Sequence, residues 1–190
     1  MAAFILGIAL FFGIHSISIF ALPLRDKLAA KSPLGWKAFY ALVSLAGLVL
    51  LVSGYGELRQ APSVLYVAPA WLHHVAALLL LPTFIFFLAP YFPGKIKNTL
   101  KNPQLIAVKT WALAHLLVNG TVADLILFGS FLAWAVAGTI SMKRRPQRPV
   151  PGAPASAAND VILIVLGLAL YCVMALWLHP MLIGVSPFAL

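Results

Sequence analysis

Long apolar runs without any charged side chain are the feature that most limits what this chain can fold into. Residues 2–22 and 161–178 contain no Asp, Glu, Lys or Arg. A helix of about 20 apolar residues spans a bilayer, whose hydrocarbon core is about 30 Å thick. Over the whole chain, 63% of residues are hydrophobic and 9% are charged. Soluble domains average about 45–50% and about 25%, and disordered chains are polar, so the sequence indicates an integral membrane protein.

The apolar stretches predict an all-α fold, a polytopic membrane helix bundle with six transmembrane helices. The first stretch is too long for a signal peptide and no basic residue precedes it, so we expect it to be a true span. Residues 143–159 are rich in Pro, Ala and Arg, which predicts a flexible loop within a single membrane domain of residues 1–190. The spans are expected at about residues 2–22, 38–53, 71–89, 105–118, 125–141 and 161–178.

The basic residues lie almost entirely on one side of these predicted spans. Of the 13 Lys and Arg residues, all except Arg59 fall in the loops after the first, third and fifth spans or near the start of the fourth. Such residues accumulate on the cytoplasmic side, so we expect both termini on the outer side. This orientation signal explains most of the net charge of +9 without a nucleic-acid partner, and it leaves membrane lipid as the expected surrounding.

Two histidines stand out because they lie deep within the predicted spans. His15 lies in the first span and His115 in the fourth. A lone intramembrane histidine commonly hydrogen-bonds to a neighbouring helix. Two deep histidines on different helices also suit axial ligation of haem iron, whereas zinc requires more ligands. The single cysteine, Cys172, excludes an internal disulfide and a site of several cysteines. The residues alone leave both interpretations of the histidines open.

The other polar residues each have a structural and a functional interpretation. His73 and His74 begin the third span and His179 ends the sixth, so we expect them at the outer interface. There they serve either as interfacial polar groups or as the mouth of a proton or substrate path. Lys109 either extends its ammonium group to the inner interface or pairs with a haem propionate. Asn119, followed by glycine, either ends the fourth helix or lies beside a cofactor.

Several motifs resemble the NnrU family of membrane proteins, over residues 15 to about 135. The most specific is Trp-Ala-Leu-Ala-His-Leu-Leu-Val-Asn-Gly at residues 111–120. Supporting matches are His-Ser at 15–16, Leu-Arg-Asp at 24–26, Tyr-Ala-Leu-Val-Ser at 40–44, Gly-Tyr-Gly at 54–56, Pro-Gln-Leu at 103–105 and Leu-Phe-Gly-Ser-Phe at 127–131. The resemblance implies a multi-pass protein of the bacterial inner membrane. One departure is Asn102, where the family usually has a histidine.

The same family includes the plant 15-cis-ζ-carotene isomerase, which the chain resembles at both deep histidines and near the C-terminus. This resemblance implies a haem b whose iron is held by His15 and His115. If His115 holds a haem, helical spacing places Trp111 and Asn119 beside it, and Lys109 is the possible propionate partner. The implied activity is a haem-dependent isomerisation of a hydrophobic polyene, in which an iron ligand is released on reduction. Bacterial members of the family are associated with denitrification and nitric oxide metabolism, which implies a redox role as the other possibility.

Two functions of other classes are also consistent with the sequence, which by itself assigns no catalytic residue. A non-enzymatic accessory protein would assist the assembly of a nitric oxide or nitrite reductase, or deliver electrons to it, and would show no turnover alone. A small proton-coupled transporter would use the histidines as proton relays and would be colourless. No inverted repeat favours the transporter. An absorption spectrum therefore separates the haem hypothesis from the transporter.

Overall fold

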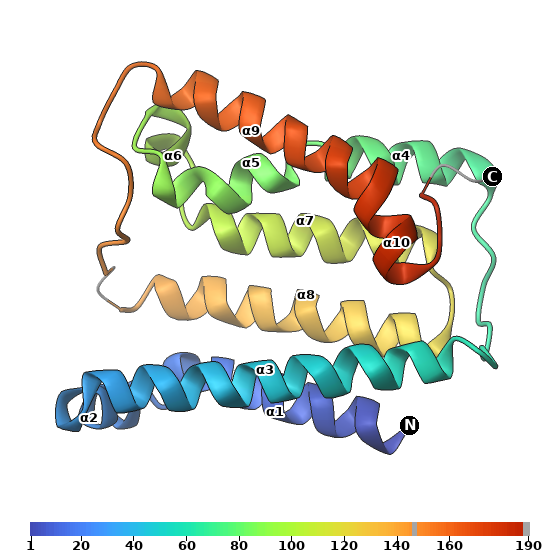
Figure 1. The fold of residues 1–190 in the computed structure, drawn as a ribbon, viewed down its shortest axis with the longest axis horizontal. Coiled ribbons are helices and arrows are strands. Elements are labelled where there is room, and N and C mark those ends of the chain that lie inside the picture. The colour runs from blue at the N-terminus through green and yellow to red at the C-terminus, as the bar shows by residue number, and fades with distance from the viewer. Residues whose placement is uncertain (146–147, 188–190) are drawn as a thin grey trace. The chain divides into compact units, whose positions relative to one another are not determined.

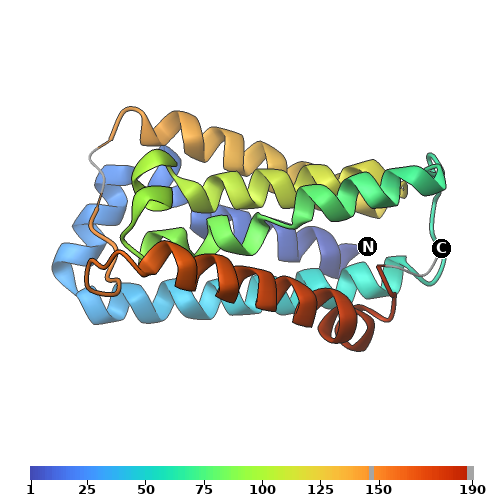
Figure 2. The same cartoon turned by 90° about the horizontal axis from the view of Figure 1, so that it is seen from above.

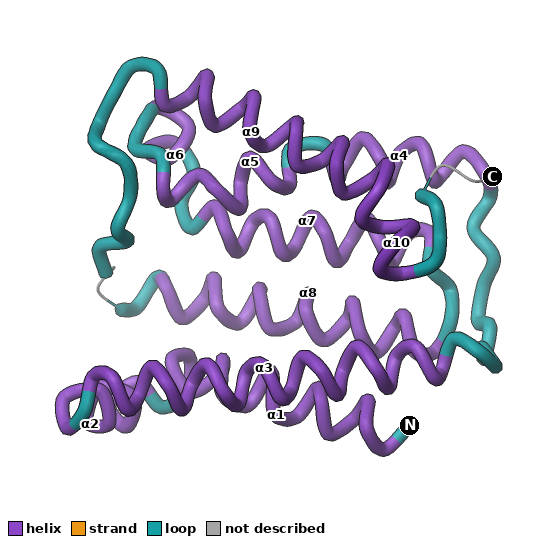
Figure 3. The backbone as a smooth tube through the Cα atoms, in the orientation of Figure 1, coloured by secondary structure: helices purple, strands orange, loops and turns teal. Residues whose placement is uncertain are grey.

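The structure of the protein, a computed structural model, is built from helices (Figure 1) and describes residues 1–145 and 148–187. Helix accounts for 77% of the chain, and the described part contains no strand (Figure 3). A lone antiparallel bridge joins Val64 to Thr121. The expected all-α fold class is therefore confirmed.

Among the described residues, five segments are long and apolar enough to cross a membrane, as judged by length and composition. They are Ala2–Phe20, Pro33–Leu58, Ala70–Tyr91, Val122–Met142 and Asn159–Ile183. A sixth apolar helix, α7 (Pro103–Val118), has 16 residues and covers about 24 Å of a core that is about 30 Å thick. Five to six helices are thus able to span a membrane, which supports a multi-pass membrane protein. The remaining elements are α2 (Leu22–Lys31), α6 (Lys95–Thr99) and the pieces into which two long segments divide.

The first predicted span, residues 2–22, corresponds to one helix that a second, short helix follows, and the helix of the second predicted span is longer than expected. α1 (Ala2–Phe20) ends before Ala21, whose φ of −134° and ψ of 48° are not helical. A continuous helix would place the ring of Pro23 against a carbonyl of the preceding turn, so α2 starts anew. α3 (Pro33–Leu58) begins where the side chain of Ser32 accepts a hydrogen bond from the N–H of Gly35, at 3.1 Å.

Two of the predicted spans are interrupted in the structure. The segment predicted at 71–89 divides into α4 (Ala70–Leu80), α5 (Thr83–Leu88) and the 3₁₀ turn η1 (Ala89–Tyr91). The segment predicted at 161–178 divides into α9 (Asn159–Val173), the π-helical turn η2 (Met174–Leu178) and α10 (His179–Ile183). Pro82 and Pro180 lie at these breaks, and each lacks the N–H that an unbroken helix requires.

The chain folds into two compact units. The first unit contains residues 1–65 and 121–130, and the second contains residues 66–120 and the described residues from 131 onward. α8 (Val122–Met142) contributes residues to both units. The prediction of a single membrane domain stays a prediction.

Within the first unit, α1 and α3 lie side by side with glycines at their contact. A Cβ atom at Gly54 would lie 2.4 Å from the backbone nitrogen of Phe4, and one at Gly7 would lie 2.3 Å from that of Leu51. At Gly47 the corresponding distance, to the backbone nitrogen of Phe11, is 2.7 Å. The expected stop of the second span before Gly54 was therefore wrong. Gly54 lies within α3 instead of ending it, and its lack of a side chain lets the backbones of α3 and α1 come into contact.

Within the second unit, α5 lies against α7 and α9, and α4 lies against α7 (Figure 2). The loop predicted to be flexible contains no helix in its described residues before α9, but hydrogen bonds hold it at several points. The N–H of Ala153 donates to the carbonyl of Tyr91, at 2.8 Å. The side chain of Asn159 donates to the carbonyls of Pro93 and Pro154. These contacts fix the start of α9.

Candidate cofactor pocket

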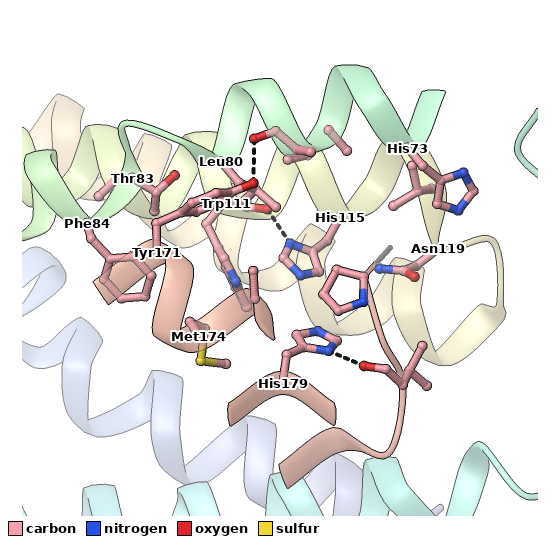
Figure 4. A pocket seen from close by; sticks show the side chains of 18 of the residues that line it. His73, Leu80, Thr83, Phe84, Trp111, His115, Asn119, Tyr171, Met174 and His179 are labelled. Carbon is pink, nitrogen blue, oxygen red and sulfur yellow. Dashed lines mark hydrogen bonds between the residues drawn. The ribbon is translucent and has the colours of Figure 1, made fainter. Parts of the chain in front are cut away.

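An apolar pocket of about 410 Å³ lies within the second unit (Figure 4). Its lining comes from α4 and α5, from α7, from α9 with η2 and α10, and from residues 185–187, with Phe131 of α8 added. No charged side chain lines it among the described residues. The size and the apolar walls with few polar groups are those of a small-molecule site. The polar lining residues are His73, Thr83, His115, Asn119, Tyr171, His179 and Ser186.

His115 extends into this pocket from the last turn of α7 (Figure 4). Its Nδ1 lies 2.9 Å from the carbonyl oxygen of Trp111, one turn earlier in the helix. A carbonyl only accepts hydrogen bonds, so this contact assigns the proton to Nδ1 and leaves the lone pair of a neutral ring on Nε2. A hydrogen bond of this kind fixes the orientation of an imidazole that binds metal through its other nitrogen. His115 therefore has the arrangement of a metal-ligating histidine.

The rings beside His115 restrict how it can rotate. The Trp111 ring lies 5.1 Å from the His115 ring, and a second contact of 5.1 Å places Trp111 edge-to-face against Phe131. Trp111 and Asn119, both expected near a cofactor, line the same pocket as His115. Lys109 is half-buried on α7 and is not among the lining residues. The structure thus brings three of these four residues of α7 and its C-terminal cap to one cavity.

The chain just beyond α7 is held by a close backbone contact. The hydroxyl group of Tyr66 contacts the carbonyls of Leu116 and Asn119 at the end of the helix. The N–H of Tyr66 donates to the carbonyl of Gly120, and a Cβ atom at Gly120 would lie 1.9 Å from the Tyr66 carbonyl oxygen. The expected helix stop at Asn119 is confirmed. The φ angle of Gly120 is not positive, so the position does not need glycine for its backbone conformation. It needs glycine because a side chain would collide with the Tyr66 carbonyl.

Two polar atoms of the pocket lining are buried without a hydrogen-bond partner in the protein. They are Nδ1 of His73, at the start of α4, and Oγ1 of Thr83, whose residue is 9% exposed. A buried polar atom without a partner costs about 1–3 kcal/mol. A molecule in the cavity would have these two atoms available as hydrogen-bond partners. Sequence reasoning placed His73 at the outer interface and missed Thr83, for which the preceding proline was the available signal.

His179 lines the pocket from α10, on a different wall from His115 (Figure 4). Its Nδ1 lies 2.6 Å from the carbonyl oxygen of Val185, so the proton is again assigned to Nδ1. On the same segment, the Tyr171 hydroxyl donates to the carbonyl of Ala77 in α4, at 3.1 Å. His179 was expected at the outer interface, and Tyr171 was not expected to join two helices beside the pocket.

His15, the other deep histidine of the sequence, belongs to the first unit. Its Nδ1 lies 2.7 Å from the carbonyl oxygen of Phe11, which assigns the proton as in His115. The His15 ring stacks on Phe11 with 4.2 Å between centroids, and the ring of Tyr40 lies 5.0 Å away. Its surroundings are thus aromatic and its orientation is fixed within α1.

The donor set of the pocket fits a haem better than a bare metal ion. Among the described residues, no group of three or more His, Cys, Asp or Glu side chains could hold an ion. Haem iron already has four ligands from its macrocycle and needs one or two from the protein. Oriented imidazoles, apolar walls and unpartnered polar atoms meet that need.

Comparisons with known proteins give the family of the chain. No curated protein and no solved structure gave a significant match. The family model described as NnrU protein matches residues 3–187, which is nearly the whole chain. The chain therefore belongs to the NnrU family.

Proposed function

We propose that the protein is an integral membrane haem b protein in which His115 and His15 hold the iron. The observation that carries this proposal is the geometry of His115. Its Nδ1 proton is directed to the Trp111 carbonyl at 2.9 Å, and its ring enters an apolar pocket of about 410 Å³. His15 repeats the same local arrangement with the Phe11 carbonyl at 2.7 Å. Membership of the NnrU family is consistent with this ligand pair.

The residues around His115 have separate roles in this proposal. Trp111 fixes the imidazole through its carbonyl and packs against it, so that the ligand bond forms without loss of side-chain freedom. Alanines such as Ala107 and Ala114 leave room along α7 for a flat macrocycle, and both are fully or almost fully buried. His73 and Thr83 offer polar atoms to substituents of the cofactor or of a substrate. The apolar walls exclude water.

The haem, when bound, supplies redox-linked chemistry to a hydrophobic molecule or to a nitrogen oxide. We favour cis–trans isomerisation of a polyene because the pocket lining carries no charged residue. The proposed location is the bacterial inner membrane. Membrane lipid surrounds the protein, and a hydrophobic substrate or a redox partner meets it there. The alternative role is that of an accessory protein for a nitric oxide or nitrite reductase.

Haem binding is tested with protein that is produced with ample haem, purified in detergent and examined by absorption spectroscopy. The matched variant is His115→Asn, because the asparagine amide can still donate to the Trp111 carbonyl but supplies no ligand nitrogen. We expect a Soret band in the wild type and its loss in His115→Asn. His74→Ala is the control, since His74 is exposed and does not line the pocket. A wild type that stays colourless under these conditions refutes the proposal.

The isomerase role is tested by expression beside a pathway that accumulates 15-cis-ζ-carotene. The expected result is that the wild type converts the central 15-cis double bond to trans and that His115→Asn does not. Haem binding without conversion, together with loss of reductase activity when the protein is deleted, would favour the accessory role.

A further inference from the structure

We propose that His179 would hold the haem iron together with His115, so that it could take the place of His15. This inference rests on the proposed function, since it concerns the same cofactor. It goes beyond the ligand pair that the family resemblance implies, because the resemblance assigns no ligand role to His179. His115, His179 and the pocket that they line all belong to the second unit.

The first step is the local fold that directs His179 into the pocket. α9 changes to the π-helical turn η2 over Met174–Leu178, directly before His179. π-helical turns are rare and occur frequently at functional sites. The wider turn changes the direction in which later side chains point, so His179 does not continue the face set by α9. Figure 4 shows the His179 ring extending into the pocket below His115.

The second step is the return of the chain that fixes the tautomer of His179. Gly184 ends α10 with φ of +77°, a left-handed conformation that favours glycine. This turn brings the carbonyl of Val185 to Nδ1 of His179, at 2.6 Å. The proton is therefore on Nδ1, and Nε2 carries the lone pair of the neutral ring. His179 thereby acquires the electronic arrangement already described for His115.

The third step concerns what two such rings can do in one cavity. Both imidazoles direct their Nδ1 protons to carbonyls, at 2.9 Å for His115 and 2.6 Å for His179. At Nε2 each ring only accepts, so the two rings cannot hydrogen-bond to one another through these atoms. An electron-pair acceptor is what both can bind at once. Haem iron with open positions on its two faces is such an acceptor.

The fourth step excludes a simpler metal site and identifies the competing occupant. The described pocket lining contains no Asp, Glu or Cys, so a bare ion would lack the further ligands it needs. A molecule with two hydroxyl groups would also satisfy two acceptor nitrogens, which makes it the alternative occupant.

Exchange of His15 for His179 replaces one neutral imidazole by another, so it transfers no proton and no electron.

The experiment compares the spin state of the ferric haem in single and double variants by absorption and electron paramagnetic resonance spectroscopy. The central variant is His179→Asn, because the asparagine amide can still donate to the Val185 carbonyl and so preserves the return of the chain. His179→Asn is combined with His15→Ala. The matched double variant combines His15→Ala with His74→Ala, which removes a histidine outside the pocket.

We expect His15→Ala to keep a six-coordinate, low-spin haem, and the double variant with His179→Asn to become high-spin. Added imidazole should restore the low-spin spectrum of that double variant, and the double variant with His74→Ala should stay low-spin. A high-spin haem, or no haem, in His15→Ala alone overturns the inference. So does a low-spin haem in the double variant with His179→Asn. A colourless wild type is a different result, because it refutes the proposed function itself.

Discussion

The buried carboxylate of the first unit and the pocket of the second differ in how their polar atoms are satisfied. In the first unit, the carboxylate of Asp124 is 5% exposed and accepts three hydrogen bonds. They come from the Tyr55 hydroxyl at 2.5 Å and from the N–H and hydroxyl of Thr121 at 2.9 and 2.7 Å. In the second unit, polar atoms of His73 and Thr83 are buried at the pocket without a partner. The Asp124 carboxylate is thus satisfied by protein groups, and the one unpartnered atom of the described first unit, Oγ of Ser44, lines no described pocket, whereas those of His73 and Thr83 face a cavity.

The helices of the two units also differ in their continuity. α1 and α3 are continuous, and their glycines bring backbone against backbone. The helices around the pocket are interrupted near Pro82 and before Pro180. Close packing leaves little space between helices, while breaks turn side chains toward a shared cavity. We infer that the close packing of α1 and α3 serves mainly stability, whereas the breaks in the second unit shape its pocket.

The largest expected effect comes from a side chain added between α1 and α3. In Gly54→Leu the new Cβ meets the Phe4 backbone, at 2.4 Å from its nitrogen, and backbone cannot yield as a flexible side chain would. We expect a loss of about 3 kcal/mol in stability, seen as a lower midpoint of thermal unfolding in detergent. Gly56→Leu is the control on the same helix, since nothing lies within 4 Å of a Cβ there. Equal effects of the two variants would contradict the role of backbone contact.

A smaller loss of stability, but a larger effect on the pocket, is expected from Gly120→Ala. Its Cβ would lie 1.9 Å from the Tyr66 carbonyl oxygen, so the segment that contacts the end of α7 must move. We expect a loss of about 2 kcal/mol together with a lower haem content, because the N–H of Asn119 donates to the carbonyl of His115, at 2.8 Å. Gly129→Ala, with nothing within 4 Å of its Cβ, serves as the control. Normal haem content in Gly120→Ala would show that the pocket does not depend on this contact.

One substitution, threonine to valine, should have opposite effects in the two units. In Thr121→Val the Asp124 carboxylate loses a donor and the Asp124 N–H loses its acceptor, at 3.1 Å, so we expect a loss of about 1 kcal/mol. In Thr83→Val an unpartnered hydroxyl is removed, so we expect the haem-free protein to gain about 1 kcal/mol. Thermal unfolding of both variants without haem checks the signs. A destabilised Thr83→Val would mean that its hydroxyl is satisfied within the protein.

The sequence predicted most of the long apolar helices but fewer of their ends and breaks. Long apolar runs indicate helices because a buried backbone must satisfy its own hydrogen bonds. The end of α3 depends instead on a contact of Gly54 with another helix, which no local pattern encodes. His115, which lines the pocket, was singled out in the sequence because it lies deep in a predicted span. The sequence placed His179 at the outer interface, since no local pattern indicates the π-helical turn and the return at Gly184. These two features direct the His179 ring into the pocket.

The smallest expected effect is that of Tyr171→Phe, which removes a hydrogen bond between α9 and α4 beside the pocket. The Tyr171 hydroxyl donates to the Ala77 carbonyl at 3.1 Å, but that carbonyl also accepts from the N–H of Leu81 at 3.2 Å. No acceptor is left without a donor, so only the gain of one bond disappears, about 0.6 kcal/mol in a membrane. Thermal unfolding and haem titration should show a small shift and a nearly unchanged affinity. A large loss of haem would instead indicate that the Tyr171 hydroxyl contacts the bound molecule. The pocket of the second unit would then use Tyr171 for its ligand, in addition to the polar atoms that have no partner in the protein.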